Sequence, residues 1–539
     1  MTNEFQKPQD SHDITRYIPL LVILMIGLFL AILNQTLLNV AIPHLITEFG
    51  VSANTAQWLL TGYMLVNGAL IPLSPFLIER FAVRRLFLFA MFCFTLGSLI
   101  CGIATGFPVM LIGRLIQAIG GGVLAPLVMT IIIFIFPPEI RGKGMGIFGL
   151  AMMFAPAVGP TLSGWVVQNY DWHLLFTGMV PLGGIVLIFA FFSLKDIQPP
   201  KKVKVDGLSV FTSLAGMSLL LYGFSEAGND GWDDLIVLST MITGAFLLII
   251  FTIRQLRIEK PLLDMRIFNY GIFSLSAIIN IVLTISLFSG MFLLPIYLQS
   301  LRGYSPLDSG LLLLPGAIIM LIMSPVSGIL FDKVGPRPLA IFGMAITTVT
   351  TYLFTRLTME TPFSFIVVIY MFRMFGMSFL MMPIMTAGLN QLPKHLSSHG
   401  TSMSNTLRQV SGSIGISLIT TIFTNRTTFH MNEMQTSMNT ADPFFMNSFN
   451  EFVQKIAMSL HLPLAQAQQQ AAKILFGKAS QQSSVYGIND AFIWATVISA
   501  IGLILSFFLR DVRKDKAKAA AATPQKDEVL LLPSPKNVS

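Results

Sequence analysis

Charge is scarce in this sequence. Only 11% of its 539 residues are Asp, Glu, Lys or Arg, whereas 54% are apolar and the mean hydropathy is +0.72. A soluble protein has roughly a quarter of its residues charged. Because the deficit extends along nearly the whole chain, the composition excludes a string of soluble domains and indicates that lipid is the main solvent.

Cysteine is nearly absent as well. The chain has only Cys93 and Cys101, both in one apolar segment and neither near a His cluster. This excludes a secreted-type disulfide framework and argues against a metal site. A phosphate-binding loop of the form G-x-x-x-x-G-K-[ST] is also missing, so we do not expect this chain to hydrolyse ATP. No catalytic constellation converges in the sequence, and we expect neither an enzyme nor a cofactor.

Long apolar runs dominate instead. About twenty apolar residues cross the hydrocarbon core as a helix, and strand-like alternation is absent. We therefore predict an all-α polytopic membrane protein whose first apolar run is a retained span, because it is too long for a signal peptide. Fourteen spans are predicted, at 18–40, 56–78, 86–105, 108–134, 144–167, 174–194, 207–226, 235–253, 272–299, 309–330, 338–357, 363–388, 401–424 and 490–509.

Positive charge is distributed unevenly about these spans. With both termini in the cytoplasm, 25 of the 34 Lys and Arg residues fall on the cytoplasmic side and six on the opposite side, as the positive-inside rule requires. The net charge of +8 then reflects membrane orientation rather than a nucleic-acid partner. Outside the spans we predict a cytoplasmic N-terminus at 1–17, a long extracytoplasmic loop at 425–489 with short amphipathic helices, and a disordered basic cytoplasmic tail at 510–539.

Two predicted cytoplasmic turns repeat one charge pattern, after the second and the tenth span. The repeat predicts two six-helix halves, at 18–194 and 272–509, joined by a linker with two extra helices at 195–271. The charges either set topology only or form a latch that is made in one access state and broken in the other. Recurrence in register favours the latch, whose residues are Glu79, Arg80 and Arg84 in the first turn and Asp332, Lys333 and Arg337 in the second.

Several polar residues fall at membrane depth. A buried arginine is costly unless it is paired or hydrated, so Arg114, with Gln117 one turn further on, is a functional candidate. We predict that Arg114 faces a cavity, with snorkelling as the alternative; for Arg408, near the cytoplasmic end of its span, the two readings are equally weighted. Neutral polar residues either line the same wet path or join helices by hydrogen bonds: Asn34, Gln35, Asn39, Asn67 and Asn280.

Several motifs, in order along the chain, resemble those of the major facilitator superfamily, and specifically its fourteen-helix drug:proton antiporters of the EmrB/QacA type. They lie at 33–43, in the two charged turns, and at 114–126, 149–164, 305–316 and 405–409. The resemblance covers 15–424 and the last span. It implies the superfamily fold, a bacterial plasma (inner) membrane, and antibiotic resistance through proton-coupled efflux. One departure is Asn34, where the family usually has an aspartate.

Span five matches the family's antiporter motif. Small residues recur every four positions there, which lets another helix approach closely. Tight packing alone is one reading; the resemblance implies that this helix also seals the interface between the halves. The motif residues are Gly149, Ala155, Pro156, Gly159, Pro160 and Gly164.

Proton coupling needs a group that titrates, and the spans contain almost no central carboxylate. Our hypothesis assigns the coupling proton to Glu226, at the outer end of span seven, or to Asp308, at the start of span ten. Each is equally well explained as a solvated charge at a helix end.

The expected function is export of small amphiphilic or cationic drugs in exchange for protons. The 30 Met and 44 Phe residues suit promiscuous binding of such molecules. An exporter of one endogenous metabolite or lipid-like compound is the alternative. A non-transporting membrane sensor or scaffold is less favoured, because two latches exceed what a scaffold needs. Membrane lipids surround the protein, and a periplasmic adaptor protein is a further candidate partner.

Overall fold

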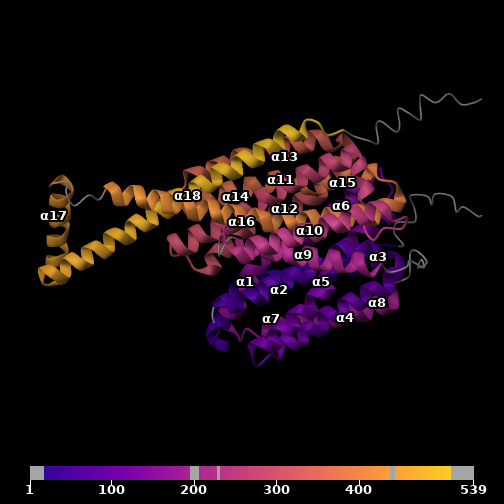
Figure 1. The fold of residues 1–539 in the computed structure, drawn as a ribbon, viewed down its shortest axis with the longest axis horizontal. Helices are drawn as coiled ribbons and strands as arrows, with labels where there is room; N and C mark the ends of the chain where they lie inside the picture. Colours follow the sequence, from indigo (N-terminus) through magenta and orange to yellow (C-terminus); the bar gives the residue numbers. More distant parts are fainter. Residues whose placement is uncertain (1–16, 52, 195–205, 228–230, 438–442, 511–539) are drawn as a thin grey trace, which may run out of the picture.

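The predicted spans form long helices that lie side by side in one bundle (Figure 1). The computed structural model describes residues 17–51, 53–194, 206–227, 231–437 and 443–510, and within these ranges every regular element is helical. This confirms the prediction of an all-α polytopic membrane protein. The predicted tail at 510–539 and most of the predicted N-terminus at 1–17 lie outside the described residues.

The first half contains six long helical segments, two of which consist of two successive α-helices each. Proline at the first turn starts several of them, because it lacks the N–H that a helix start leaves unpaired. Gly50 ends the first helix with φ +60°, a conformation that favours glycine, and its N–H bonds to the Ile46 carbonyl. The elements are α1 (Ile18–Phe49), α2 (Ala53–Leu70), α3 (Ser74–Arg80), α4 (Val83–Gly102), α5 (Phe107–Ile135), α6 (Arg141–Asn169), α7 (Leu174–Thr177) and α8 (Met179–Ser193).

Two extra helices, α9 (Gly207–Ala227) and α10 (Leu235–Arg257), form an antiparallel pair. They pack backbone to backbone, since a Cβ at Gly244 would lie only 2.6 Å from the Leu220 nitrogen. The Arg254 guanidinium donates to both carboxylate oxygens of Asp206, at 2.7 and 2.9 Å, and these hydrogen bonds lower the Asp206 pKa to about 2. The pairing is therefore kept above that pH and lost only in stronger acid.

The second half repeats the plan of the first and ends in two longer helices. Its elements are α11 (Gly271–Pro295), a π-helical turn at Ile296–Leu301, α12 (Pro306–Val334), α13 (Pro336–Leu353), α14 (Phe363–Ser378), α15 (Met381–Gln391), α16 (Ser397–Ser437), α17 (Pro443–Leu460) and α18 (Leu464–Ser506).

Among the described residues, thirteen helices are long and apolar enough to cross a membrane. The predicted span at 401–424 is the one that is not among them. It lies in α16, which nevertheless contacts α5, α9, α11 and α18 along the bundle. Many of its hydroxyl and amide groups lie inside the protein, since Thr401, Ser402, Asn405, Ser411 and Ser417 are buried. Composition alone therefore fails to mark this helix as a span.

The segment predicted as a loop at 425–489 is instead mostly helical. Helices α16 and α18 continue out of the bundle, and α17 lies across their far end (Figure 1). Apolar residues on one face of α17 explain this, because Val453 and Ile456 pack on Ala467 and Ala471 of α18. We call the bundle end nearest to this extension the α17 end, and the opposite end, where α3 and the Asp332 turn lie, the Asp332 end.

If α16 crosses the membrane, the Asp332 end and α17 lie on opposite sides. We expect Lys333→Cys and Lys455→Cys, introduced separately into a Cys93→Ser/Cys101→Ser chain, to react with a membrane-impermeant maleimide from opposite faces, because both side chains are exposed. Labelling is compared in intact cells and inverted vesicles. Reaction of both cysteines from the same face would contradict the arrangement, and the Cys-free chain is the control.

Candidate functional site

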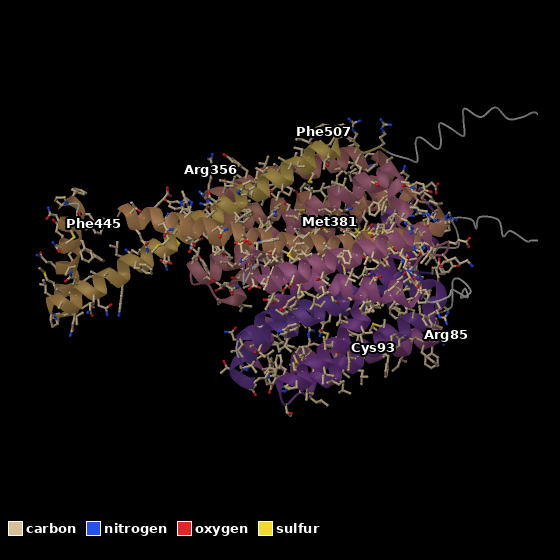
Figure 2. The ribbon with its side chains drawn as sticks, viewed as in Figure 1. Arg85, Cys93, Arg356, Met381, Phe445 and Phe507 are labelled. Carbon is tan, nitrogen blue, oxygen red and sulfur yellow. The ribbon has the colours of Figure 1, made fainter. Side chains whose placement is uncertain are left out.

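A cavity of about 340 Å³ lies between the two halves, near the middle of the bundle, where Figure 2 labels the lining residue Met381. Both halves contribute to it, through α1, α2, α5 and α6 on one side and α11, α12, α14, α15 and α16 on the other. Six methionines line it: Met64, Met152, Met291, Met320, Met374 and Met381.

The lining is largely apolar, with a few polar groups. Its aromatic residues are Tyr63, Phe288, Phe292 and Tyr370, and the one charged side chain among the described lining residues is that of Arg408. Methionine is adaptable and polarisable, and aromatic rings supply flat apolar faces. The cavity is thus suited to a small molecule with a large apolar body and a polar group.

Arg114 of α5 lies behind the cavity wall. It is fully buried, and its guanidinium carbon is 4.4 Å from the ring centroid of Tyr63, which lines the cavity. Its Nη1 donates to Asn34 Oδ1 at 2.6 Å and to Gln117 Oε1 at 3.0 Å. Nη2 is buried without a hydrogen-bond partner in the described residues. The charge of Arg114 is therefore held by neutral groups alone.

Arg373 of α14 repeats this arrangement in the second half. It too is fully buried, and its Nη2 donates to the Ser286 carbonyl of α11. A Cβ at Gly290 would collide with its guanidinium, so glycine makes room for it. In each half an arginine of the fourth long helix lies against the first, α5 on α1 and α14 on α11. This is the contact expected of two related halves.

The predicted path residues separate into two layers. Gln35, Asn67 and Arg408 line the cavity, whereas Asn34 and Gln117 lie behind it with Arg114. Asn280 donates to the Ser276 carbonyl of its own helix and is not among the lining residues. The side chain of Asn39 lies outside the described residues. Tyr63, Phe288 and Tyr370 were not singled out from the sequence, because isolated aromatic residues in an apolar run carry no signal.

Asp332 joins the halves at the Asp332 end. Its carboxylate accepts the backbone N–H groups of Gly142 at 3.0 Å and of Lys143 at 3.1 Å, at the start of α6. A helix start carries unpaired N–H groups and partial positive charge, so a carboxylate is stabilised there. Lys333 and Arg337 are exposed.

The first charged turn has a different geometry. The Nη2 of Arg84 donates to the Phe191 carbonyl of α8 at 2.7 Å, within the same half, and Arg80 is exposed with its guanidinium carbon 5.8 Å from the Phe81 ring centroid. Glu79 is half-buried at the end of α3. The two turns therefore share charge pattern but differ in the contacts described for them.

Further polar contacts join the halves at the same end. Arg141 is buried, and its Nη1 donates to Asn390 Oδ1 at 2.5 Å. The hydroxyls of Thr130 and Thr401 are 2.7 Å apart, and a similar pair joins α3 to α16. Sequence reasoning treated Arg141 only as a topological charge, because its burial depends on a helix more than two hundred residues away. Together these contacts hold the two halves against each other at the Asp332 end.

Helix α6 packs closely on both halves. On one side a Cβ at Gly142 would overlap the Gly328 carbonyl of α12, and one at Gly146 would lie 2.9 Å from the Ser324 carbonyl. On the other side Gly159 faces Thr36 of α1. Of the remaining predicted motif residues, Gly149 contacts α12, Ala155 and Gly164 are buried, and Pro156 lines the cavity. The helix continues through Pro156 and Pro160.

Neither predicted proton acceptor lines the cavity. Asp308 forms a capping box with Ser305, whose hydroxyl accepts the Asp308 N–H at 3.1 Å while the carboxylate accepts the Ser305 N–H at 3.2 Å. Glu226 is half-buried near the end of α9. The assignment of the proton to either acid stays a prediction.

The pattern that defines the Major Facilitator Superfamily matches residues 24–416. The chain belongs to this superfamily. This transporter is 63% identical over 517 residues to the MFS-type transporter YhcA of Bacillus subtilis strain 168, with 96% of each chain covered. It is 36% identical to the lincomycin resistance protein LmrB of the same organism, over 93% of this chain and 97% of LmrB. The solved structure of the human organic anion transporter MFSD10 shares its fold, with a TM-score of 0.60, 13% identity, and 92% of this chain and 100% of that one covered.

Asn34 is the neutral partner of Arg114, and we expect its loss to destabilise the first half of this transporter. Asn34→Leu removes the closest acceptor of a buried guanidinium, which costs about 1–3 kcal/mol and lowers the unfolding temperature in detergent. Asn34→Asp restores an acceptor with a countercharge and should not lower it. Asn280→Leu is the matched control, since Asn280 bonds only within its own helix in the described structure. Equal losses for the two leucine variants would contradict this role.

Asp332 is expected to hold the Asp332 end closed. Asp332→Asn removes the charge and one acceptor at the start of α6, which weakens a charge-assisted contact by about 1.5–3 kcal/mol. A cysteine placed at Thr401, buried in the seam, should then react with maleimide roughly tenfold faster or more. Lys333→Gln alters the neighbouring exposed charge and serves as control. If Asp332→Asn leaves the labelling rate unchanged, Asp332 does not hold the Asp332 end closed.

Proposed function

We propose that this transporter exports amphiphilic molecules across the bacterial plasma membrane in exchange for protons, with both termini in the cytoplasm. The observation that carries the proposal is the cavity between the halves, which is lined by six methionines and several aromatic rings, while hydrogen bonds join the halves at the Asp332 end. The positive-inside distribution of Lys and Arg supports a cytoplasmic location for that end. We infer that the arrangement of the halves is one that is closed toward the cytoplasm.

Alternating access follows from the same contacts. The seam at the Asp332 end is made of short-range hydrogen bonds and of glycines in backbone contact, which are either formed or broken as the halves rock. A substrate would enter from the cytoplasmic side when Asp332 leaves the start of α6. It would leave when the seam forms again. LmrB, which is related over most of its length, is named for resistance to lincomycin, and this supports a drug-like substrate.

The coupling proton needs an acid outside the cavity, because no carboxylate is among the described lining residues. Glu226 is our first choice, because the capping box already gives Asp308 a structural role. Protonation of such an acid would be linked to the seam through the helices on which it lies.

The experiment is transport into inverted vesicles of a dye whose fluorescence reports accumulation, with and without an imposed proton gradient. We expect gradient-dependent accumulation that stops when the gradient is dissipated. Accumulation that is independent of the gradient would exclude proton antiport, and no accumulation of any amphiphile would exclude drug export.

The same vesicles test the two acids. Glu226→Gln should abolish the effect of the gradient, whereas Asp308→Asn should weaken the capping box, which lowers stability by about 1 kcal/mol at most, and leave coupling intact. Asp206→Asn, which changes a carboxylate of the α9–α10 pair, is the control. Unchanged coupling in Glu226→Gln and in the double variant Glu226→Gln/Asp308→Asn would exclude both acids as the site of the coupling proton.

A further inference from the structure

The charges around the cavity are all of one sign. Arg408 lines the cavity, and Arg114 lies directly behind the lining residue Tyr63. On α14, Arg373 is followed directly by the lining residue Met374 and lies about one turn from the lining residue Tyr370. Arg114 and Arg373 lie in helices that are long and apolar enough to cross a membrane, and Arg408 lies in α16. No Asp or Glu is among the residues that the structure places around the cavity.

None of the three guanidinium groups is paired with a carboxylate in the described residues. The Nη2 of Arg408 donates to Asn405 Oδ1 at 3.1 Å, Arg114 donates to Asn34 and Gln117, and Arg373 donates to a backbone carbonyl. Arg114 and Arg373 also keep buried nitrogen atoms without a partner. Neutral acceptors orient an arginine but leave its charge in place.

Uncompensated positive charge in a low-dielectric interior selects the sign of a ligand. A cation in the cavity would be repelled by all three arginines, whereas an anion would supply the missing countercharge. Guanidinium binds carboxylate, sulfonate and phosphate oxygens through paired N–H donors, which adds geometry to the charge preference. The positive potential of the cavity thus favours a ligand that carries an anionic group.

The apolar body of such a ligand also has a place. Phe288 lies against α16 one turn from Arg408, since a Cβ at Gly412 would be 3.0 Å from its ring. Phe288 belongs to α11, and Met291 and Phe292, one turn further along α11, also line the cavity. An acidic head group at Arg408 would therefore leave an aromatic or aliphatic body against these side chains.

We propose that the substrates of this transporter are amphiphilic anions, with the acidic group bound by Arg408. This rests on the export function proposed above and replaces the cationic class with its opposite. Arg408 is the residue that contacts the substrate, and Arg114 and Arg373 contribute through the positive potential that they set behind the wall.

Binding of three matched probes to the purified full-length protein in a nonionic detergent tests the proposal. The probes share a naphthalene body and carry a sulfonate, a trimethylammonium or an uncharged methoxy group. We expect the sulfonate to bind at least about tenfold more tightly than the ammonium compound, by isothermal titration. Equal or tighter binding of the ammonium compound to the wild-type protein would overturn the proposal without any variant.

Variants then locate the contact. Arg408→Gln should weaken sulfonate binding about tenfold and leave the methoxy compound unchanged, and Arg408→Lys should retain part of the sulfonate preference. Arg356→Gln, which removes an exposed guanidinium at the α17 end, is the matched control and should bind as the wild type does. Thermal unfolding verifies that each variant is folded. An equal loss for all three probes in Arg408→Gln, or unchanged sulfonate binding, would exclude Arg408 as the anion contact.

The same probes in inverted vesicles separate this proposal from export itself. If the sulfonate binds through Arg408 but does not accumulate, export fails and the anion site stands. If the ammonium compound accumulates and the sulfonate neither binds nor accumulates, export stands and the anion site is overturned.

Discussion

Lipid offers no hydrogen-bond partner, and this constraint shapes every polar feature of the bundle. A helix with many hydroxyl and amide groups can lie at membrane depth only if other helices cover them. Helix α16 largely meets this requirement, because it packs on α5, α9, α11 and α18 and many of its polar residues between 401 and 417 are buried. The same constraint forces the buried arginines to find acceptors within the protein, which they do on α1 and α11.

The contacts between the two halves tolerate little displacement of one half relative to the other. At Gly142 and Gly328 the backbones of α6 and α12 touch, so a side chain at either position would force the helices apart. Asp332 adds a carboxylate at the start of α6, close to the same point. Close packing and directional hydrogen bonds are satisfied or lost together, so contacts of this kind favour discrete arrangements over a continuum. Such a seam is what a machine with alternating access needs.

The cavity and the arginines are linked through its wall. Tyr63 lines the cavity, and the guanidinium of Arg114 lies over its ring, so a positive charge that is not itself exposed lies next to the neutral lining. Asn34 is decisive here. With an aspartate at this position Arg114 would be neutralised, whereas the amide orients it and leaves the charge. One side-chain oxygen exchanged for nitrogen thus changes the electrostatic character of the whole site.

Membrane class, helix positions and superfamily could be predicted from the sequence, because hydropathy and charge asymmetry act locally along the chain. The sequence also pointed to Arg114, Arg408 and the Asp332 turn, since a charge in an apolar run or a repeated charge pattern stands out without knowledge of its neighbours. The course of α16 and α18 beyond the bundle was missed, because polar helices stabilised by each other lack an apolar signal. Only the tertiary structure decided that Asn34 is the partner of Arg114, that Arg141 is buried against Asn390, and that Arg408 rather than Arg114 reaches the cavity. These contacts join residues far apart in sequence, and which side chains meet across two packed helices depends on the rotation and approach of the helices, which no local pattern encodes.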